Sequence, residues 1–286
     1  MWLPTYDGSG QAVHPDIVGP EQTGGVYLMA FTPYPFTNDR FENPSVVISD
    51  DGLRFREERR GLNPLAPTPG TDHNDDPDIL CAEGHYDLVY LETRRPDGQN
   101  LVLLRSTDRL RWTRSVVARY QLVGQRPDPF IVSPALVRRN GTIHLFYVDA
   151  SRRPHRIELL QSREMAAWNR NEAQVPKFDR LRVNPWHVDV VDGEPFSYML
   201  ITEVLDEGSP RPLFDLHIAR SRDLLHWQMG SRKVFAEKPF GSRLVYRSTA
   251  LCRGRDIYVY FSCKTRFGEW KIGVVREKLA RLFGDE

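Results

Sequence analysis

Short apolar segments bounded by turn residues recur along the whole chain. At five places a segment opens with polar or charged residues, continues into a glycine-containing turn and is followed by a second apolar segment. The five openings are His14-Pro15-Asp16-Ile17-Val18, Asp76-Pro77-Asp78-Ile79-Leu80, Ser133-Pro134-Ala135-Leu136-Val137, His187-Val188-Asp189-Val190-Val191 and Arg247-Ser248-Thr249-Ala250-Leu251. They start at residues 14, 76, 133, 187 and 247, so the steps between them are 62, 57, 54 and 60. Apolar runs of this length, bounded by glycine turns, predict β-strands joined as hairpins.

Each repeat also ends in a similar way. A serine begins a short polar stretch, and in four repeats an aromatic residue stands six positions after that serine. The pairs are Ser49 with Phe55, Ser106 with Trp112, Ser162 with Trp168, and Ser221 with Trp227, and an eroded fifth tail runs from Arg276 to Phe283. This pattern predicts a polar hairpin turn followed by an aromatic side chain that anchors neighbouring repeats to each other.

A strand-rich unit that returns every 40–60 residues or so is the sequence signature of a β-propeller. We therefore predict an all-β protein, one five-bladed β-propeller domain over residues 1–286, with four-stranded antiparallel blades around a central funnel. The blades are expected at about 14–60, 76–118, 133–170, 187–235 and 247–283. Residues 1–13 precede the first blade and could close the ring by adding a strand to the fifth.

The openings of the five repeats bring ionisable residues into the predicted funnel. Strand alternation places the first and third residues of each opening on the same face. Seven of these ten residues are ionisable, although the neighbouring positions are apolar, and buried charges are costly unless they are paired or functional. The first positions hold His14, Asp76, Ser133, His187 and Arg247, and the third positions hold Asp16, Asp78, Ala135, Asp189 and Thr249.

A second ring is expected where the second strands end, at the rim where the innermost strands begin. Its members are Thr32, Glu92, Asp149, Glu203 and either Ser262 or Cys263. The loop over residues 32–44, which contains Asn43, combines aromatic and polar residues as binding-site loops often do. Together these residues predict a polar site at one end of the funnel.

Concentrated carboxylates with histidine and arginine suit three kinds of chemistry. Glycoside hydrolysis needs a carboxylic acid and a carboxylate base or nucleophile, and crowded carboxylates raise one carboxyl pKa into the useful range. Metal binding is the second, because the openings offer suitable ligands: His14, Asp16, Asp76, Asp78, His187 and Asp189. The third is recognition of sugar hydroxyl groups without turnover. A salt-bridged propeller core is the structural alternative to all three.

Composition narrows the range of partners. With 39 basic and 38 acidic residues the formal charge is +1, which argues against a nucleic acid or a membrane surface recruited by bulk charge. The three cysteines, Cys81, Cys252 and Cys263, form no Cys-x-x-Cys motif and are expected to be reduced. The N-terminus has no basic region followed by an apolar run, so we expect a cytoplasmic protein or a component of a phage particle.

On these residues the chain resembles the five-bladed β-propeller glycosidases, the superfamily that holds glycoside hydrolase families 43, 32, 62, 117 and 130. The resemblance rests on the opening Asp76-Pro77-Asp78, the segment Asn43-Pro44-Ser45-Val46-Val47 and the serine tails. It covers nearly the whole chain, and His14-Pro15-Asp16 with Pro185-Trp186-His187 is similar to a poorly characterised bacterial and phage branch. It implies the propeller fold and a glycoside hydrolase acting on an oligo- or polysaccharide.

The chain departs from the family 43 pattern at the catalytic positions. Where that pattern has Asp, Asp and Glu, this sequence has His14, Ser133 and His187, so the family triad does not carry over. We therefore expect Asp16, two residues further along in blade one, to be the base and Glu203, the blade-four carboxylate of the second ring, to be the acid. Asp189 or His187 are alternative acids, and the resemblance to family 117 implies that a histidine can take that role. Asp78 would tune their pKa values. The expected substrate-binding set is His14, Asp76, His187, Arg247, Glu92, Asp149 and Asn43.

Two alternatives remain open. The missing family triad favours a non-catalytic carbohydrate-binding propeller. The second alternative is a metal-dependent enzyme or lyase that acts on sugars, with ligands among the His and Asp residues of the openings. Catalysis by carboxylates requires no cofactor, whereas family precedent implies a structural divalent ion, such as calcium, in the funnel. A carbohydrate is the expected partner, with neither nucleic acid nor membrane, and the sequence predicts no particular oligomeric state.

Overall fold

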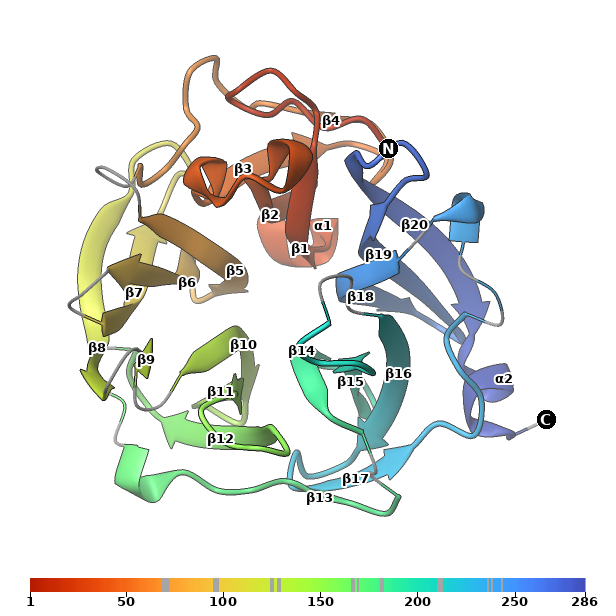
Figure 1. Cartoon of the computed structure of the whole chain (residues 1–286). Helices are drawn as coiled ribbons and strands as arrows, with labels where there is room; N and C mark the ends of the chain where they lie inside the picture. The colour runs from red at the N-terminus through yellow and green to blue at the C-terminus, as the bar shows by residue number, and fades with distance from the viewer. Residues whose placement is uncertain are drawn as a thin grey trace.

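The computed structural model contains five β-sheets arranged as blades around a central channel (Figure 1). It describes residues 1–67, 72–94, 98–123, 126–127, 130–165, 168, 170–180, 183–209, 213–235, 237, 239–242 and 244–285. The predicted all-β fold with five blades is confirmed. The opening of each repeat forms the innermost strand of its blade, as the order of strands within each sheet shows.

The strands follow the repeat. Blades one and two contain β1 (Ala12–Val18), β2 (Tyr27–Pro33), β3 (Ser45–Ser49) and β4 (Phe55–Arg56), then β5 (His73–Ala82), β6 (His85–Arg94), β7 (Gly98–Ser106), β8 (Thr113–Val123) and β9 (Arg126–Pro127). Blades three to five contain β10 (Ile131–Arg139), β11 (Thr142–Asp149) and β12 (Arg156–Ser162), then β14 (Pro185–Val191), β15 (Ser197–Val204), β16 (Phe214–Ser221) and β17 (His226–Met229), then β18 (Leu244–Arg253), β19 (Asp256–Lys264) and β20 (Trp270–Lys278). The helices are α1 (Pro20–Thr23), α2 (Leu279–Phe283), and the 3-10 turns η1 (Pro35–Thr37), η2 (Asp39–Phe41), η3 (Arg170–Glu172) and η4 (Pro239–Gly241).

The outer parts of the blades differ from one another. Blade one has four strands, and within the described residues blades three and five have three while blades two and four have five. The outermost strand of blade four is β13 (Lys177–Phe178), which follows blade three in the chain and pairs with β17 in parallel. Residues 1–11 form no strand, but the Met1 amino group donates to the Ile272 carbonyl on β20 and so ties the N-terminus to blade five. Within the described residues no helix has the length and apolar character needed to span a bilayer.

A β-bulge begins the innermost strand of every blade. The register with the second strand shifts by one residue near the start of each of the five repeats, across the first residue of the opening in four blades and just before it, at Trp186, in blade four. In three blades the first residue of the repeat is left-handed: His14, Asp76 and Ser133 have φ of 53°, 50° and 57°. Such a backbone is strained in residues other than glycine and is held only by its surroundings. The bulge therefore determines where the side chain of the first residue of each repeat points, which the alternation of side chains along a regular strand does not determine.

Side chains from these bulged strands hydrogen-bond to the backbone of the next blade. Asp16 accepts from the amide of Ile79 (2.5 Å). Asp76 accepts from the amide of Ser133 (2.8 Å), and Asp78 from that of Leu136 (2.8 Å). We call these contacts, with those of Ser133 and Thr249 described next, the interblade belt.

The belt has two further parts. The Ser133 hydroxyl in blade three donates to the carbonyl of Val188 in blade four (2.7 Å) and accepts from the amide of the same residue (3.1 Å). Thr249 in blade five donates to Asp16 in blade one (3.0 Å), which joins the last blade to the first. Buried backbone amides need a partner, and here the belt side chains provide it between blades.

Five hydrophobic clusters fill the interfaces between neighbouring blades, and each takes in the aromatic residue of one tail. These residues are Phe55, Trp112, Trp168, Trp227 and Phe283. The serine and the acidic residue before them form a polar turn: Ser106 accepts from the amides of Asp108 and Arg109, and Asp108 accepts from those of Leu110 and Arg111. The predicted turn and anchor are confirmed.

Replacing Ser133 tests the belt. Ser133→Ala leaves the buried Val188 amide and carbonyl without their hydroxyl partner, which costs about 1–3 kcal/mol of unfolding free energy. We expect a lower urea midpoint with an unchanged m-value. The control is Ser231→Ala, which removes a single 3.4 Å hydrogen bond to Leu282. Equal effects of the two substitutions would contradict the belt.

The tail turns predict a specific acid sensitivity. Hydrogen bonds from backbone amides, chiefly those of Arg54 and Leu53, hold the pKa of Asp51 below its usual range. Amides of the equivalent turn, chiefly those of Arg111 and Leu110, do the same for the pKa of Asp108. A carboxylate whose pKa is lowered in the folded state stabilises the fold at pH values above its ordinary pKa. That contribution is lost as the pH falls below about 4. The double variant Asp51→Asn/Asp108→Asn should therefore lose less stability between about pH 4 and pH 2 than the parent chain.

Urea unfolding at several pH values in that window measures the effect. Asp50→Asn is the matched control, because Asp50 is a neighbouring exposed carboxylate that ion-pairs with Arg56. If the parent and the double variant lost stability in parallel, the amide contacts would not be the source of the acid sensitivity.

Candidate active site

Arg247 divides the channel into two compartments. Its side chain is fully buried and donates to Asp76 (3.2 Å), to Asp78 (3.5 Å) and to the carbonyl of Pro134 (3.1 Å). Burial would lower the pKa of this guanidinium, but the carboxylates around it, Asp76 first, hold that pKa above its usual value. Arg247 is therefore a permanent positive charge on the channel axis.

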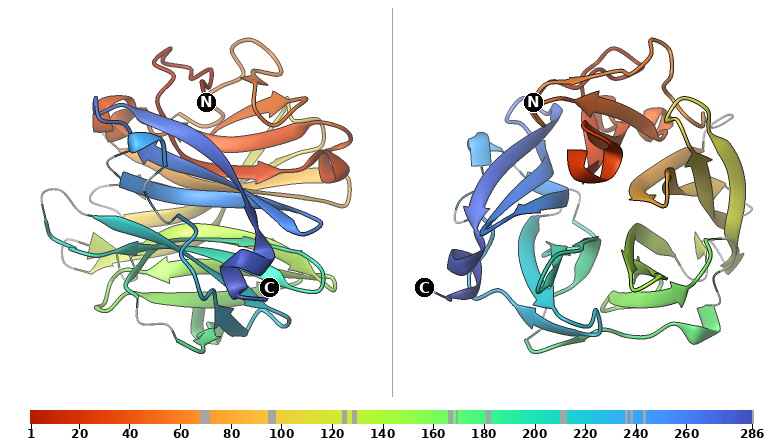
Figure 2. Two further views of the ribbon diagram at one scale, coloured as in Figure 1. Left: turned by 90° about the vertical axis from the view of Figure 1, so that its right-hand side faces the viewer. Right: turned by 180° about the vertical axis from the view of Figure 1, so that it is seen from behind.

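The two compartments lie towards opposite faces of the propeller. The face towards the viewer in Figure 1, where the innermost strands begin, is called the front, and the face where these strands end is called the back. Helix α1, which follows β1, lies at the back (Figure 2). The front triad is His14, Asp76 and His187, and the back triad is Asp16, Asp78 and Asp189. The ligand atoms within each triad lie within 4.8 Å of one another.

The front triad has the geometry of a metal-binding tripod. Nε2 of His14 and Nδ1 of His187 each lie 3.5 Å from Oδ1 of Asp76. That separation is long for a hydrogen bond, but ligand atoms around a tetrahedral zinc ion lie about 3.3–3.5 Å apart. The other nitrogen of His14, Nδ1, is 3.0 Å from the hydroxyl of Thr32, which orients the ring so that Nε2 faces Asp76.

The protonation states suit a cation. Burial lowers the pKa of His14 and lowers that of His187 further, so both rings are neutral and offer a lone pair. Burial would raise the pKa of Asp76, but His14, His187 and Arg247 together hold it below its usual range. Among the described residues, Nε2 of His14 and both nitrogens of His187 have no hydrogen-bond partner. Buried polar atoms normally have one, so the front triad fits a bound metal ion.

A second group of possible ligands borders the front triad. Glu42, His73 and Asp75 also have ligand atoms within 4.8 Å of one another. A carboxylate oxygen of Glu42 lies 3.7 Å from Nδ1 of His14. Glu42 is buried, and burial, then the negative charge of Asp75, raises its pKa well above the usual value. A buried carboxyl group beside a metal tripod can carry a proton in catalysis.

Aromatic rings line the front compartment. The Tyr246 ring lies 4.3 Å from that of His187 and 5.5 Å from that of Trp270, measured between centroids. Trp186 donates a hydrogen bond to the Tyr246 hydroxyl (3.1 Å), and Tyr34 lies 5.6 Å from Trp270. Aromatic walls with a few convergent polar groups are characteristic of small-molecule sites.

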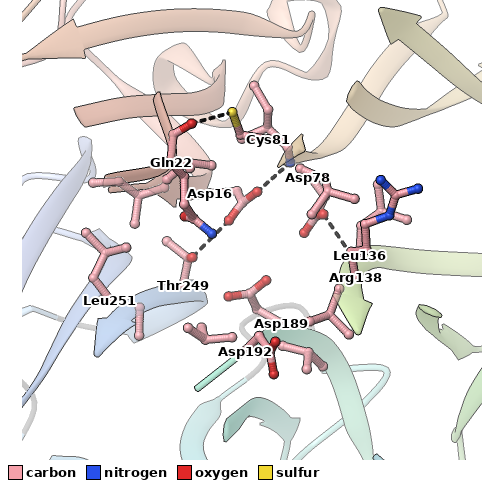
Figure 3. Close-up of a pocket in the computed structure, with 18 of the residues that line it drawn as sticks. Asp16, Gln22, Asp78, Cys81, Leu136, Arg138, Asp189, Asp192, Thr249 and Leu251 are labelled. Atoms are coloured by element: carbon pink, nitrogen blue, oxygen red, sulfur yellow. Dashed lines mark hydrogen bonds between the residues drawn. The ribbon is translucent and has the colours of Figure 1, made fainter. Parts of the chain in front are cut away.

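The back triad lines a cavity of about 380 Å³ between the ends of the innermost strands (Figure 3). Burial, then the Asp16 charge, raises the pKa of Asp189 to about 7, and the same two causes raise that of Asp78 well above its usual value. Burial also raises the pKa of Asp16, opposed by its hydrogen bond from the Ile79 amide. The structure thus brings together three predicted catalytic residues.

The predicted base and acid do not meet. Asp16 faces the back cavity, whereas Glu203 stands opposite Pro185 near the start of β14 and lies 3.0 Å from His217. Among the described residues, Glu203 is not part of the lining of the back cavity.

Two other members of the predicted second ring, Glu92 and Asp149, stand at the expected rim and make contacts within their own blades. Glu92 accepts from Arg94 (2.6 Å) and Arg114 (2.6 Å). Asp149 pairs with Arg152 (3.0 Å). These ion pairs tie the ends of the second strands to neighbouring segments of the same blade.

Asn43 lies between blades one and two. Its amide nitrogen donates to the Tyr6 hydroxyl (3.0 Å) and its oxygen accepts from Asn74 (3.0 Å). Asn43 therefore fixes the loop that carries Glu42 against the start of β5.

Sequence analysis missed Glu42, His73, Asp75 and Tyr246. Glu42 stands in the aromatic and polar loop that suggested a binding site, but no repeat marks it. Asp75 and Tyr246 directly precede a repeat opening, and His73 lies three residues before one, so all three stand just outside the positions that the repeat defines. Extending each repeat by a few residues towards the N-terminus would have included them.

Comparisons with known proteins agree with this fold. No protein-family model matches the sequence. The chain is 35% identical over 83 residues to the A type blood N-acetyl-α-D-galactosamine deacetylase of Flavonifractor plautii, a match that covers 28% of this chain and 11% of that protein. The chain therefore spans only a small part of the length of this curated relative.

Solved structures match over almost the whole chain. A crystal structure of an N-acetylgalactosamine deacetylase from F. plautii, in complex with blood group B trisaccharide, has a TM-score of 0.77 at 20% identity and covers 96% of this chain and 91% of its own. The structure of an exo-1,5-α-L-arabinanase from a bovine ruminal metagenomic library has a TM-score of 0.63 at 15% identity, and the match covers 94% of this chain and 93% of the arabinanase. The structure of a thermostable family-43 glycoside hydrolase has a TM-score of 0.66 at 14% identity, and the match covers 93% of this chain and 89% of that hydrolase. The chain has the five-bladed propeller fold of the glycosidases that its sequence resembles, a fold that it shares with a sugar deacetylase.

Proposed function

We propose that this chain is a metal-dependent hydrolase that removes the acetyl group from an N-acetylated sugar. The observation that carries the proposal is the front triad, in which buried and unpartnered imidazole nitrogens converge on an ionised carboxylate. The sequence match to a sugar deacetylase supports this choice among hydrolases. It replaces carboxylate-catalysed glycoside hydrolysis as our first candidate and corresponds to the metal-dependent alternative.

Each residue of the front compartment has its own role in the proposed reaction. His14, Asp76 and His187 would hold the ion, and a bound divalent ion supplies Lewis acidity at an acyl carbonyl. Glu42 takes a proton from the attacking water as the new C–O bond forms, and gives it to the nitrogen as the C–N bond breaks. The products are acetate and an amino sugar, so atoms and charge balance. Tyr246 and Trp186, which are only partly buried, provide aromatic surface for the sugar ring.

A second candidate is the glycoside hydrolase expected from the resemblance, with Asp16 as base and Asp189 or Glu203 as acid. Two observations favour it: the fold is that of an arabinanase, and the Asp189 pKa of about 7 suits a general acid. A binding propeller without turnover would show saturable sugar binding and no product.

Metal removal tests the first candidate. Purified protein, treated with chelator and then with single divalent ions, is assayed for acetate released from N-acetylated sugars and for sugar released from aryl glycosides. We expect acetate release that chelation abolishes and one transition metal restores. In His187→Ala and Asp76→Asn, bound metal measured by mass spectrometry and activity should fall together. Release of acetate by metal-free protein would contradict the proposal. If the parent chain cleaved glycosides and Asp16→Asn did not, the second candidate would be established.

The role of Glu42 is tested separately. Glu42→Gln keeps the shape of the side chain but cannot transfer the proton, so kcat should fall by about 10²–10⁴ while the metal content stays unchanged. Glu58→Gln, which alters a carboxylate that pairs with Arg109 in blade two, is the control and should keep parent activity. Unchanged kcat in Glu42→Gln would remove this residue from the reaction.

A further inference from the structure

Large apolar side chains are exposed on the loops of the front face. Among the described residues eight large hydrophobic side chains are exposed, and five of them stand in front segments of blades one, four and five. We call these five the front apolar residues: Phe36 (72% exposed), Leu205 (55%), Leu213 (48%), Phe240 (74%) and Phe267 (75%). Exposed apolar side chains that gather on one face mark a site of contact with a protein or a membrane.

The topology places these residues on the side of the channel mouth that holds the front triad. Because neighbouring strands are antiparallel, the connections from β2 to β3, from β15 to β16 and from β19 to β20 lie at the front. Phe36 stands in the first connection, Leu205 and Leu213 in the second, and Phe267 in the third, while Phe240 stands in η4, shortly before β18 begins. In the left view of Figure 2 the β15–β16 hairpin, in teal, and the β19–β20 hairpin, in blue, extend away from α1.

A strained turn presents two of the phenylalanines to solvent. Phe36 and Phe240 each follow a proline and have φ of 51° and 56°, in the left-handed region. Bulky residues rarely adopt this backbone, and it persists only where the surroundings hold it. The amide of Phe36 donates to Oε1 of Gln11 (3.1 Å), and the hydroxyl of Thr37 accepts from the indole of Trp270 (3.1 Å). The fold therefore fixes the exposed position of the Phe36 ring.

Two exposed arginines accompany the front apolar residues. The guanidinium carbon of Arg266 lies 4.7 Å from the ring centroid of Phe267, and Arg40 stands in η2, directly after the turn that carries Phe36. Within the part of the chain that the structure describes, neither arginine has an ion-pair partner. Free basic groups beside apolar side chains are typical of segments that lie in the headgroup region of a bilayer.

The chemistry of the front face favours a lipid surface over a sugar or a protein. Phenylalanine and leucine have no polar atom that could bond to sugar hydroxyl groups. The front apolar residues come from three blades, whereas a protein interface has one contiguous apolar core. Separate apolar side chains on one face, with arginines next to them, match a flat and laterally uniform partner.

We propose that the front face docks on a lipid bilayer, with the front apolar residues inserted among the headgroups and Arg40 and Arg266 at the lipid phosphates. The channel mouth then faces the membrane. The formal charge of +1 is compatible with this docking, because the apolar side chains and not the bulk charge supply the attraction. The proposal replaces the expectation, drawn from bulk charge, that no membrane is a partner.

Vesicle binding tests this docking independently of the hydrolase proposal. The full chain is mixed with vesicles of equimolar phosphatidylcholine and phosphatidylglycerol, and the bound protein is measured by sedimentation. We expect binding that persists at about 1 M sodium chloride, where charges are screened beyond about 3 Å. Phe36→Asn/Phe267→Asn should weaken the binding by about tenfold or more, because two apolar rings no longer leave water. Asparagine tolerates the left-handed backbone at position 36, and circular dichroism checks that the variant folds.

A matched pair of leucines identifies the face that binds. Leu205 is 55% exposed at the front, and Leu53 is 52% exposed in the turn between β3 and β4 at the back. Leu205→Ser should weaken vesicle binding, whereas Leu53→Ser should bind like the parent chain. Absence of binding by the parent, its loss at high salt, or equal effects of the two leucine variants would each overturn the proposal. A dimer in ultracentrifugation without vesicle binding would assign the front face to a second copy of the chain and would also overturn it.

Discussion

The ring of five blades depends on how the innermost strands satisfy their backbone across the channel. Each of these strands begins with a bulge, which interrupts the ladder within its own sheet. Asp16, Asp76 and Asp78 accept amides of the following blade, so side chains replace the missing backbone partners. Carboxylates suit this task because a charge-assisted hydrogen bond is shorter and stronger than a neutral one. The same choice places several negative charges on one axis, and Arg247 offsets part of them.

This arrangement explains why structural and chemical roles coincide in the channel. One oxygen of Asp76 belongs to the belt, while the other faces His14, His187 and Arg247. Among the described residues, the imidazole nitrogens that face Asp76 have no hydrogen-bond partner. These nitrogens are thus buried polar atoms of the channel that the fold does not already use. A substitution of His14 or His187 can be separated experimentally from one that breaks the belt.

The solved structures that match this chain include glycosidases and a deacetylase, which shows that one propeller carries different reactions. The reason lies in the few residues at the bulges. A glycosidase needs an acid and a second carboxylate flanking the scissile bond. This chain has His14, Ser133 and His187 where the family 43 pattern has carboxylates, and a neutral buried imidazole has a lone pair suited to a metal ion and not the acid or base chemistry of a carboxyl pair. The scaffold is shared, while the donor atoms at the channel mouth differ.

The sequence by itself determined the number of blades, the identity of the innermost strands and the aromatic anchors, because those features repeat at a fixed period and follow from local polarity. It also placed His14, Asp76, His187 and Arg247 in one funnel. The front triad consists of first positions of the openings and the back triad of third positions. Only the tertiary structure decided that Arg247 stands between the two sets, because bulges, left-handed residues and interblade amides do not alter the apolar pattern. Glu42 reaches the front triad through a loop, and loop paths are set by packing against other blades, as Asn43 against Asn74 shows.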